Sequence, residues 1–498
     1  MVGISGLVQK GLSRASARLE NALQRTDSAT EKPSLPHRPS IGSTGALGEE
    51  EAALPVPPAV FPSLLSKDTK TPARELVGPY LGYETALRKA FAADTSGIGD
   101  RANLVPVYDG HESSFVIRTV DREKGDGEKY LMPLRDQERE DEGSLAIAPS
   151  LEEYKKNVDA FTHGVLSGID WSNVVAAGSS ALLPLLSKRK DVSLDLDPSV
   201  DDPREAYYEV TANTSDIDLF IYGLDSEEAA IKRILELEAV VRKNQRLAPG
   251  TGLTLRSEHA ITIISPKYPH RHIQIILRLY KSISEILTGF DVDSSCVAFD
   301  GTQVYTTPRG VTAITTRTNN IDLTRRSPSY ENRLYKYRHH NFEGYWDGLE
   351  RSRISDDYFN HESLGLARLL YFEEWLRELA RRSWISRVDR YRTHRYKRRI
   401  TDVADLGLVH ASGYATHELL FGARCTAAKV RDHVMENPNR EPCMFGTLDE
   451  VIKGDTSGEG KVSGKVTFMS HDPGRQMIGS FHPLTDDDWT KMAYEGTG

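Results

Sequence analysis

The stretch 214–222 constrains this chain more than any other part of the sequence. It reads Thr-Ser-Asp-Ile-Asp-Leu-Phe-Ile-Tyr, an apolar run with Asp216 and Asp218 at its start. The Ile, Leu, Phe and Tyr residues predict a buried β-strand. Residues two apart on a strand point to the same face, so we expect the two carboxylates to lie together. Like charges that close raise each other's pKa, and a divalent cation between them removes the repulsion.

A second strand signal lies upstream, where the short apolar run 173–177 ends in Gly178 and Ser179 and a helix is predicted over 180–186. Glycine lets the backbone pass close to a ligand, and the free N–H groups of a helix N-terminus bind phosphate. A plain strand-to-helix turn has the same local sequence. The functional interpretation therefore depends on finding the Gly-Ser turn together with the Asp-x-Asp strand.

With this Gly-Ser turn, helix and Asp-x-Asp strand, the chain resembles the nucleotidyltransferase superfamily typified by DNA polymerase beta, over roughly residues 150–320. The resemblance implies a mixed β-sheet flanked by helices. It also implies transfer of a nucleoside monophosphate from an NTP, with Mg²⁺ or Mn²⁺ as cofactor. On this basis Asp216 and Asp218 are the expected catalytic metal ligands, and Gly178 and Ser179 are expected to bind the nucleotide phosphates.

The family pattern also has a third acid on a later strand, and this acid helps the nucleophile. By position the predicted strand 272–277 should carry it, but the residue there is Gln274. A neutral amide cannot act as a general base and is a poorer Mg²⁺ ligand. Asp291 and Asp293, one short helix further on, either substitute for the acid or belong to a turn before the next strand. The alternative to an enzyme is a catalytically inactive protein of this fold that binds nucleotide or protein as an interaction module.

The element pattern predicts an α+β (mixed α/β) fold with helices around a mixed sheet. Residues 27–75 are rich in Pro, Ser, Glu and Thr, a composition that buries too little apolar surface to fold. Residues 302–316 are rich in Thr, Val and Ala and are predicted to be extended. We expect four regions: a disordered N-terminal tail and linker (1–72), an N-terminal α/β extension (73–149), a nucleotidyltransferase-like domain (150–323) with a polar insertion (187–213), and a mainly helical, partly basic C-terminal region (324–498).

The charge distribution bears on the partners. Net charge is −9 over 498 residues, so the whole chain is not a nucleic-acid-binding polycation. The segment 377–399 interleaves arginines with Trp and Tyr, which suits either a nucleic-acid backbone or a solvated face packed on acidic parts of the chain. Four basic residues near the predicted strands either contact triphosphate or are surface charges: Lys243, Arg256, Arg271 and Arg278. The acceptor of the nucleotide, whether protein, RNA or small molecule, is not identified by these patterns.

Three widely spaced cysteines match no zinc-ligand pattern and indicate a reducing intracellular compartment, cytoplasmic or nuclear. Residues 1–26 are rich in Arg, Ser and Ala with amphipathic spacing, which is typical of either a mitochondrial transit peptide or a fraying helical tail. No apolar run approaches the roughly 18–20 residues that cross a bilayer, so no membrane span is expected.

Overall fold

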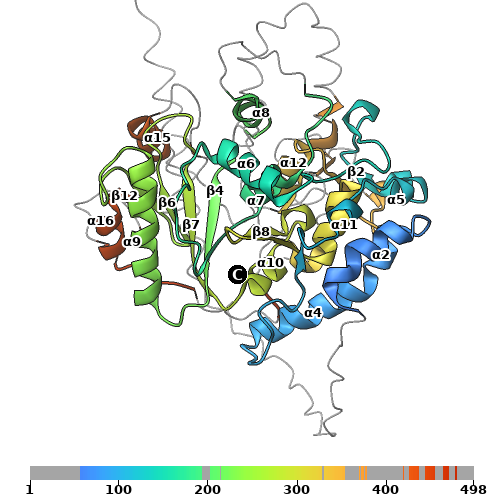
Figure 1. Ribbon diagram of the computed structural model, residues 1–498, viewed down its shortest axis with the longest axis horizontal. Helices are drawn as coiled ribbons and strands as arrows, with labels where there is room; N and C mark the ends of the chain where they lie inside the picture. The colour runs from blue at the N-terminus through green and yellow to red at the C-terminus, as the bar shows by residue number, and fades with distance from the viewer. Residues whose placement is uncertain are drawn as a thin grey trace, which may run out of the picture. The chain divides into compact units, whose positions relative to one another are not determined.

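The chain has a mixed α+β fold, as the sequence predicted (Figure 1). The described residues all belong to one compact unit. The predicted amphipathic tail at 1–26, and the basic segment 377–399 apart from Arg377, lie outside these described residues. The computed structural model describes residues 56–192, 202–212, 215–327, 330–353, 369–370, 372–374, 376–377, 419, 426–436, 443–454, 462, 464–469 and 477–478.

The larger of two sheets has nine strands in the described residues. Neighbouring strands are antiparallel except β4 and β7, which are parallel. Its order is β1 (Val105–Pro106), β9 (Val304–Thr306), β8 (Val297–Phe299), β3 (Val174–Ala177), β4 (Ile217–Tyr222), β7 (Ile273–Tyr280), β6 (Ala260–Ile263), β5 (Thr254–Arg256) and β12 (Met444–Gly446). The smaller sheet has the order β10 (Thr318–Asn320), β11 (Glu343–Tyr345) and β2 (Tyr130–Leu131).

Helices pack on both faces of the large sheet. The α-helices are α2 (Phe61–Lys67), α3 (Ala73–Leu76), α4 (Gly78–Ala92), α5 (Val120–Glu123), α6 (Leu151–Thr162), α7 (Ser179–Leu185), α8 (Pro203–Thr211), α9 (Glu227–Asn244), α10 (Ile283–Gly289), α11 (Pro308–Thr316), α12 (Tyr330–Arg338), α15 (Ala427–Met435) and α16 (Leu448–Lys453). Short 3₁₀ helices are η1 (Pro58–Val60), η2 (Glu112–Ser114), η3 (Gly127–Lys129), η4 (Asp136–Glu138), η5 (Asp293–Ser295), η6 (Leu323–Arg325) and η7 (Arg351–Arg353). Among the described helices, none has the length and apolar character that crossing a membrane requires.

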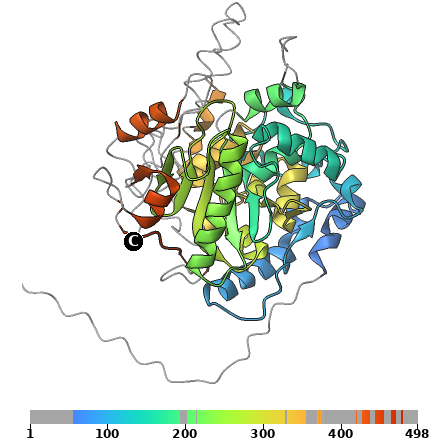
Figure 2. The ribbon, with the colours of Figure 1, turned by 60° about the vertical axis from the view of Figure 1, so that its left-hand side comes forward.

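Side-chain alternation along β4 separates the two faces. Ile217, Leu219 and Ile221 pack in one apolar cluster with residues of α6, α8 and α9, and Figure 2 shows α9 lying along the strands. Phe220 points to the other face, where it joins residues of α10. Asp216 and Asp218 share the parity of Phe220, so they lie on the α10 side of the sheet.

Two helices begin at serine residues whose side chains cap them. The Ser150 hydroxyl caps α6 by accepting a hydrogen bond from the Glu153 N–H at 3.2 Å. The Ser226 hydroxyl caps α9 in the same way through the Ala229 N–H at 3.2 Å. Each cap accepts a hydrogen bond from a backbone N–H that has no partner within the first helical turn. Because this interaction spans only three residues, the local sequence is enough to place the start of the helix.

Two other expectations are corrected. The predicted tail does not extend to residue 72, because α2 is present and both Phe61 and Leu65 are fully buried. Their spacing of four places them on one helix face, where core contacts outweigh the surrounding prolines. Residues 302–316 are extended only as far as β9. The Thr307 side chain then caps α11, with Pro308 at its first position, a favoured helix start that overrides the β-propensity of the following residues.

Candidate functional site

The start of β4 brings together residues from three neighbouring strands. Asp218 lies opposite Gln274 of the parallel strand β7. On the other side, β3 is antiparallel, with Ala176 opposite Leu219. Because β3 therefore ends where β4 begins, the turn after β3 lies at the same end of the sheet. We call this cluster the β4 entrance site, formed by Gly178, Ser179, Asp216, Asp218 and Gln274.

Gly178 has a backbone conformation that few other residues adopt. Its φ of 72° and ψ of −139° fall in a region that is essentially restricted to glycine. Its N–H donates to the Val297 carbonyl at 3.0 Å, which holds the turn against β8. Ser179 follows as the first residue of α7, whose opening N–H groups have no partner within the helix. The turn thus presents backbone donors at the end of the sheet.

The two aspartates carry incompletely compensated negative charge. Burial raises the pKa of Asp216 to about 6, against the charges of Lys336 and Arg271, which lower it. Burial and the neighbouring Asp216 raise the pKa of Asp218 to about 7, while Lys336 and Arg333 lower it. A cation bound between the carboxylates would replace the lost solvation and remove their repulsion.

The residue opposite Asp218 is a carboxamide, not an acid. Gln274 occupies the position on β7 where the third acid of the family pattern was expected. Within the part of the chain that the structure describes, no group of three His, Cys, Asp or Glu side chains could hold a metal ion. Two carboxylates with neutral oxygens beside them still suit a hard divalent cation such as Mg²⁺. An ion held here would have one charged ligand fewer than in the family pattern.

Asp291 and Asp293 both have structural partners. Asp291 pairs with Arg333 at 3.1 Å and accepts a hydrogen bond from the Ser327 hydroxyl at 2.6 Å. Asp293 pairs with Arg309 at 3.0 Å and is buried. These contacts favour the turn interpretation over a substituted third acid.

Sequence reasoning missed the contribution of α12 to the site. Arg333 and Lys336 are exposed residues of this helix. The Lys336 charge lowers the pKa of both aspartates, and the Arg333 charge lowers that of Asp218. Tyr337, the next residue, is buried. Burial raises its pKa, and the nearby charge of Asp218 raises it further. The i, i+3 spacing of the two cations was visible in the sequence, but nothing local connects residues 333–337 to β4.

The arginines that were candidates for triphosphate contact have other roles. Arg271 is fully buried and donates to four backbone carbonyls. Arg256 is also buried and donates to the carbonyls of Val451 and Gly464 at 2.9 and 2.7 Å. Arg278 pairs with Glu285 at 3.1 Å. These side chains stabilise the fold around the sheet.

Comparison with known proteins gives two partial matches. The model of a family described as Gabija anti-defense 2 (Gad2) family protein matches residues 152–317, about a third of the chain. An uncharacterized protein of Acanthamoeba polyphaga mimivirus, R883, is 36% identical over 169 residues, which cover 32% of this chain and 37% of the relative. No solved structure matches. The family match includes every residue of the β4 entrance site.

Asp218→Asn is expected to stabilise the fold at alkaline pH. The folded-state pKa of about 7 exceeds the unfolded value, so the folded state binds more protons and the free energy of unfolding falls as pH rises between about 4 and 7. The asparagine amide does not titrate, so this pH-dependent decrease in the free energy of unfolding is absent in the variant. We expect a gain relative to wild type that is larger at pH 8 than at pH 5 by on the order of 2 kcal/mol.

Urea unfolding at the two pH values measures this difference. Asp225→Asn, at an exposed position, is the control and should leave the pH dependence of stability unchanged. A stability difference between Asp218→Asn and wild type that is equal at both pH values would contradict the expectation.

Proposed function

We propose that the protein is a Mg²⁺-dependent nucleotidyltransferase that uses the β4 entrance site to transfer a nucleoside monophosphate from an NTP to an acceptor. One observation carries the proposal. Asp216 and Asp218 share one face at the start of β4, beside the end of β3 where the Gly178–Ser179 turn lies, and their pKa values are raised. The resemblance to the nucleotidyltransferase superfamily supports the same function.

Each residue has a distinct task in this proposal. Asp216 and Asp218 would hold the ion, which would supply charge neutralisation to the attacking and leaving oxygens. The turn at Gly178 and Ser179 would bind the nucleotide phosphates through backbone N–H groups. Gln274 cannot accept a proton, so a different group must take the proton of the acceptor.

A second function is favoured by a specific observation. Gln274 stands opposite Asp218, and the described residues provide no cluster of three potential metal ligands. A protein of this fold that has lost the third acid could bind nucleotide or a protein partner without catalysis. The description of the matched family further supports a role of residues 152–317 in anti-defense against Gabija. That role is compatible with nucleotidyl transfer and with binding without catalysis.

The decisive experiment uses the full chain with Mg²⁺ or Mn²⁺ and each of the four α-labelled NTPs. The protein itself, RNA and small hydroxyl compounds serve as acceptors. We expect label transfer that falls by about 10³-fold or more in Asp216→Asn/Asp218→Asn, since both proposed metal ligands are then neutral. Asp225→Asn, on the exposed loop after β4, is the matched control.

Equal transfer by wild type and the double variant would exclude this site as the catalytic centre. Nucleotide binding without transfer, lost in the double variant, would establish the non-catalytic alternative.

Gln274→Glu is expected to strengthen cation binding, because a third carboxylate then faces Asp218. We expect the Mn²⁺ affinity at pH 8 to rise by about tenfold, measured by titration calorimetry. At pH 5 both native aspartates take up protons, and Mn²⁺ binding should weaken in wild type as well. Thr262→Glu, on the neighbouring strand opposite residue 274, is a control for added charge near the site. An unchanged affinity in Gln274→Glu would show that residue 274 does not face the ion.

A further inference from the structure

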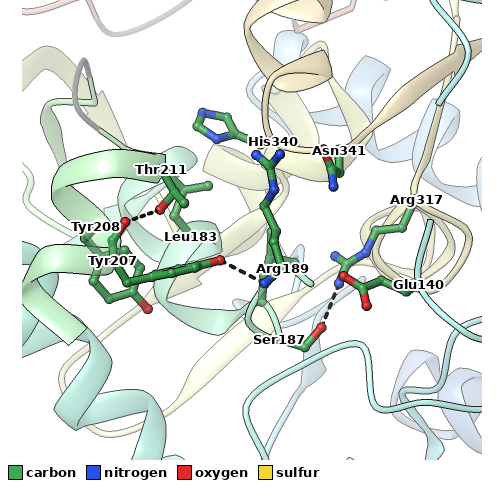
Figure 3. Close-up of a pocket in the computed structure, with 11 residues that line it drawn as sticks. Glu140, Leu183, Ser187, Arg189, Tyr207, Tyr208, Thr211, Arg317, His340 and Asn341 are labelled. Carbon is green, nitrogen blue, oxygen red and sulfur yellow. Dashed lines mark hydrogen bonds between the residues drawn. The ribbon is translucent and has the colours of Figure 1, made fainter. Parts of the chain in front are cut away.

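A small pocket lies at the far end of α7 from the Gly178–Ser179 turn (Figure 3). Leu183 of α7 lines the pocket, and Ser187 follows this helix. Tyr207 comes from α8, within the insertion. The helix α7 runs from Ser179 to Leu185, a length of about 9 Å at the helical rise of 1.5 Å per residue. The pocket is therefore separate from the β4 entrance site.

Arg317 is the residue that gives this pocket its chemistry. Its side chain has an exposed fraction of only 6%, and it lines the pocket directly after α11. Its Nη2 donates to the Ala146 carbonyl at 3.1 Å and to the Ser187 hydroxyl at 3.0 Å. Its Nη1 is buried and has no hydrogen-bond partner. A buried guanidinium donor without an acceptor is costly, and an acceptor supplied by a ligand would remove the cost.

Neutral donors surround this guanidinium. The Ser187 hydroxyl accepts from Arg317, which leaves its own hydrogen free to donate. The Tyr207 hydroxyl accepts from the Arg189 N–H at 3.1 Å and likewise keeps its hydrogen. Figure 3 shows the Ser187 hydroxyl next to Arg317 and the Tyr207 hydroxyl next to Arg189. The lining thus offers several hydrogen-bond donors to one acceptor-rich group.

The charges around the pocket are mixed, because Arg189 pairs with Asp191 at 2.6 Å and Glu140 lines the pocket together with Arg317. Burial lowers the pKa of His340 to about 3, and nearby cations, first among them Arg189, lower it further. Burial and the charge of Arg189 also lower the pKa of Arg317, to about 10, against Glu140, which raises it. Glu140 is the acidic residue of the pocket lining. Both Glu140 and Arg317 are described residues, and no ion pair joins their side chains. The Arg317 guanidinium is therefore the group that would attract an anion here, with Glu140 as the competing negative charge.

We infer that the pocket formed by Arg317, Ser187, Tyr207 and His340 is a binding site for a small oxyanion of the phosphate class. The cavity volume of about 20 Å³ leaves room for only one or two water-sized groups and is far below the size of a nucleotide pocket, so the occupant must be small. An oxyanion accepts hydrogen bonds from a guanidinium and hydroxyl groups at once, which matches the donors in the lining. This inference is independent of the proposed nucleotidyl transfer.

The test is phosphate binding to the full chain, measured by calorimetry in chloride buffer, with sulfate in parallel. We expect saturable binding that weakens by at least tenfold in Arg317→Gln, because the only described guanidinium with an unpaired buried Nη1 in the lining is then lost. Arg317→Gln should keep the wild-type Mn²⁺ affinity of the β4 entrance site, which separates this pocket from that site.

A second variant keeps the test decisive if Arg317→Gln does not fold. Glu140→Gln removes the competing negative charge, so phosphate should bind about threefold to tenfold more tightly. Glu228→Gln, an exposed acid on α9, is its control and should bind as wild type does. Phosphate affinity that is the same in wild type and Glu140→Gln, or an absence of binding in Glu140→Gln, would overturn the inference.

Discussion

Glu84→Gln is expected to lower the free energy of unfolding by about 3–5 kcal/mol, although the side chains are nearly the same size. Glu84 is 2% exposed, on α4. Its Oε1 lies 2.8 Å from Nε of Arg309 and 3.0 Å from Nη2 of Arg325. The amide removes one negative charge and leaves both buried guanidinium groups short of a counter-ion.

The surrounding network explains the size of this effect. Arg309 also pairs with Asp293 at 3.0 Å, and Arg325 also pairs with Asp322 at 3.2 Å. Arg88 lies in the same cluster, where burial, and then the charge of Arg325, lower its pKa to about 9. In wild type the charges of three arginines are balanced by those of three acids. Loss of the Glu84 charge therefore leaves an excess positive charge in the interior. Removing one partner of a buried pair is costly because the other charge stays desolvated.

Denaturant unfolding of Glu84→Gln measures the loss, with Glu228→Gln as the exposed control that should change stability by less than about 0.5 kcal/mol. Adding Arg325→Met to Glu84→Gln removes the excess charge and should recover part of the stability. A loss below about 1 kcal/mol in the single variant would contradict the view that the network depends on Glu84.

Arg271→Met is expected to destabilise the fold by about 3–5 kcal/mol, because it leaves backbone carbonyls without donors in the interior. The Arg271 guanidinium donates to the carbonyls of Phe161 at 2.7 Å, Ser215 at 2.9 Å and Tyr208 at 3.2 Å, and also to that of Ala212. It lies over the Phe161 ring at 4.1 Å. One side chain thus ties α6 and α8 to the residue that precedes Asp216.

The same substitution should disturb the β4 entrance site. The Arg271 charge lowers the pKa of Asp216, so its removal should raise that pKa above about 6. The lost cation would also have repelled a bound metal ion, so the Mn²⁺ affinity at pH 8, where proton competition is weak, should rise. Unfolding free energy and Mn²⁺ affinity are the two measurements. Arg246→Met, at an exposed position, is the control. Arg271→Lys keeps the charge but has fewer donors, so it should lose stability while its Mn²⁺ affinity stays near that of wild type. Wild-type stability in Arg271→Met would contradict the structural role.

The elements were predictable where the signal was local. The apolar run at 217–222, the serines at 150 and 226, and the Gly-Ser turn each act through hydrogen bonds or alternation within a few residues, and the structure has the corresponding strand, caps and turn. The failures at 58–67 and 308–316 arose where core contacts and a Thr-Pro helix start outweighed composition. The catalytic and cofactor roles of the site residues, and the basic segment 377–399, stay predictions.

Sequence patterns alone therefore established the α+β class, the shared face of Asp216 and Asp218, and the nearby Gly-Ser turn, since strand alternation and helix capping are short-range effects. Only the tertiary structure showed that Gln274 faces Asp218, that cations of α12 approach the aspartates, and that Arg271 is a structural donor. The physical reason is that burial and charge compensation depend on residues far apart in the chain. The local sequence around a residue does not indicate which distant side chain will be its neighbour.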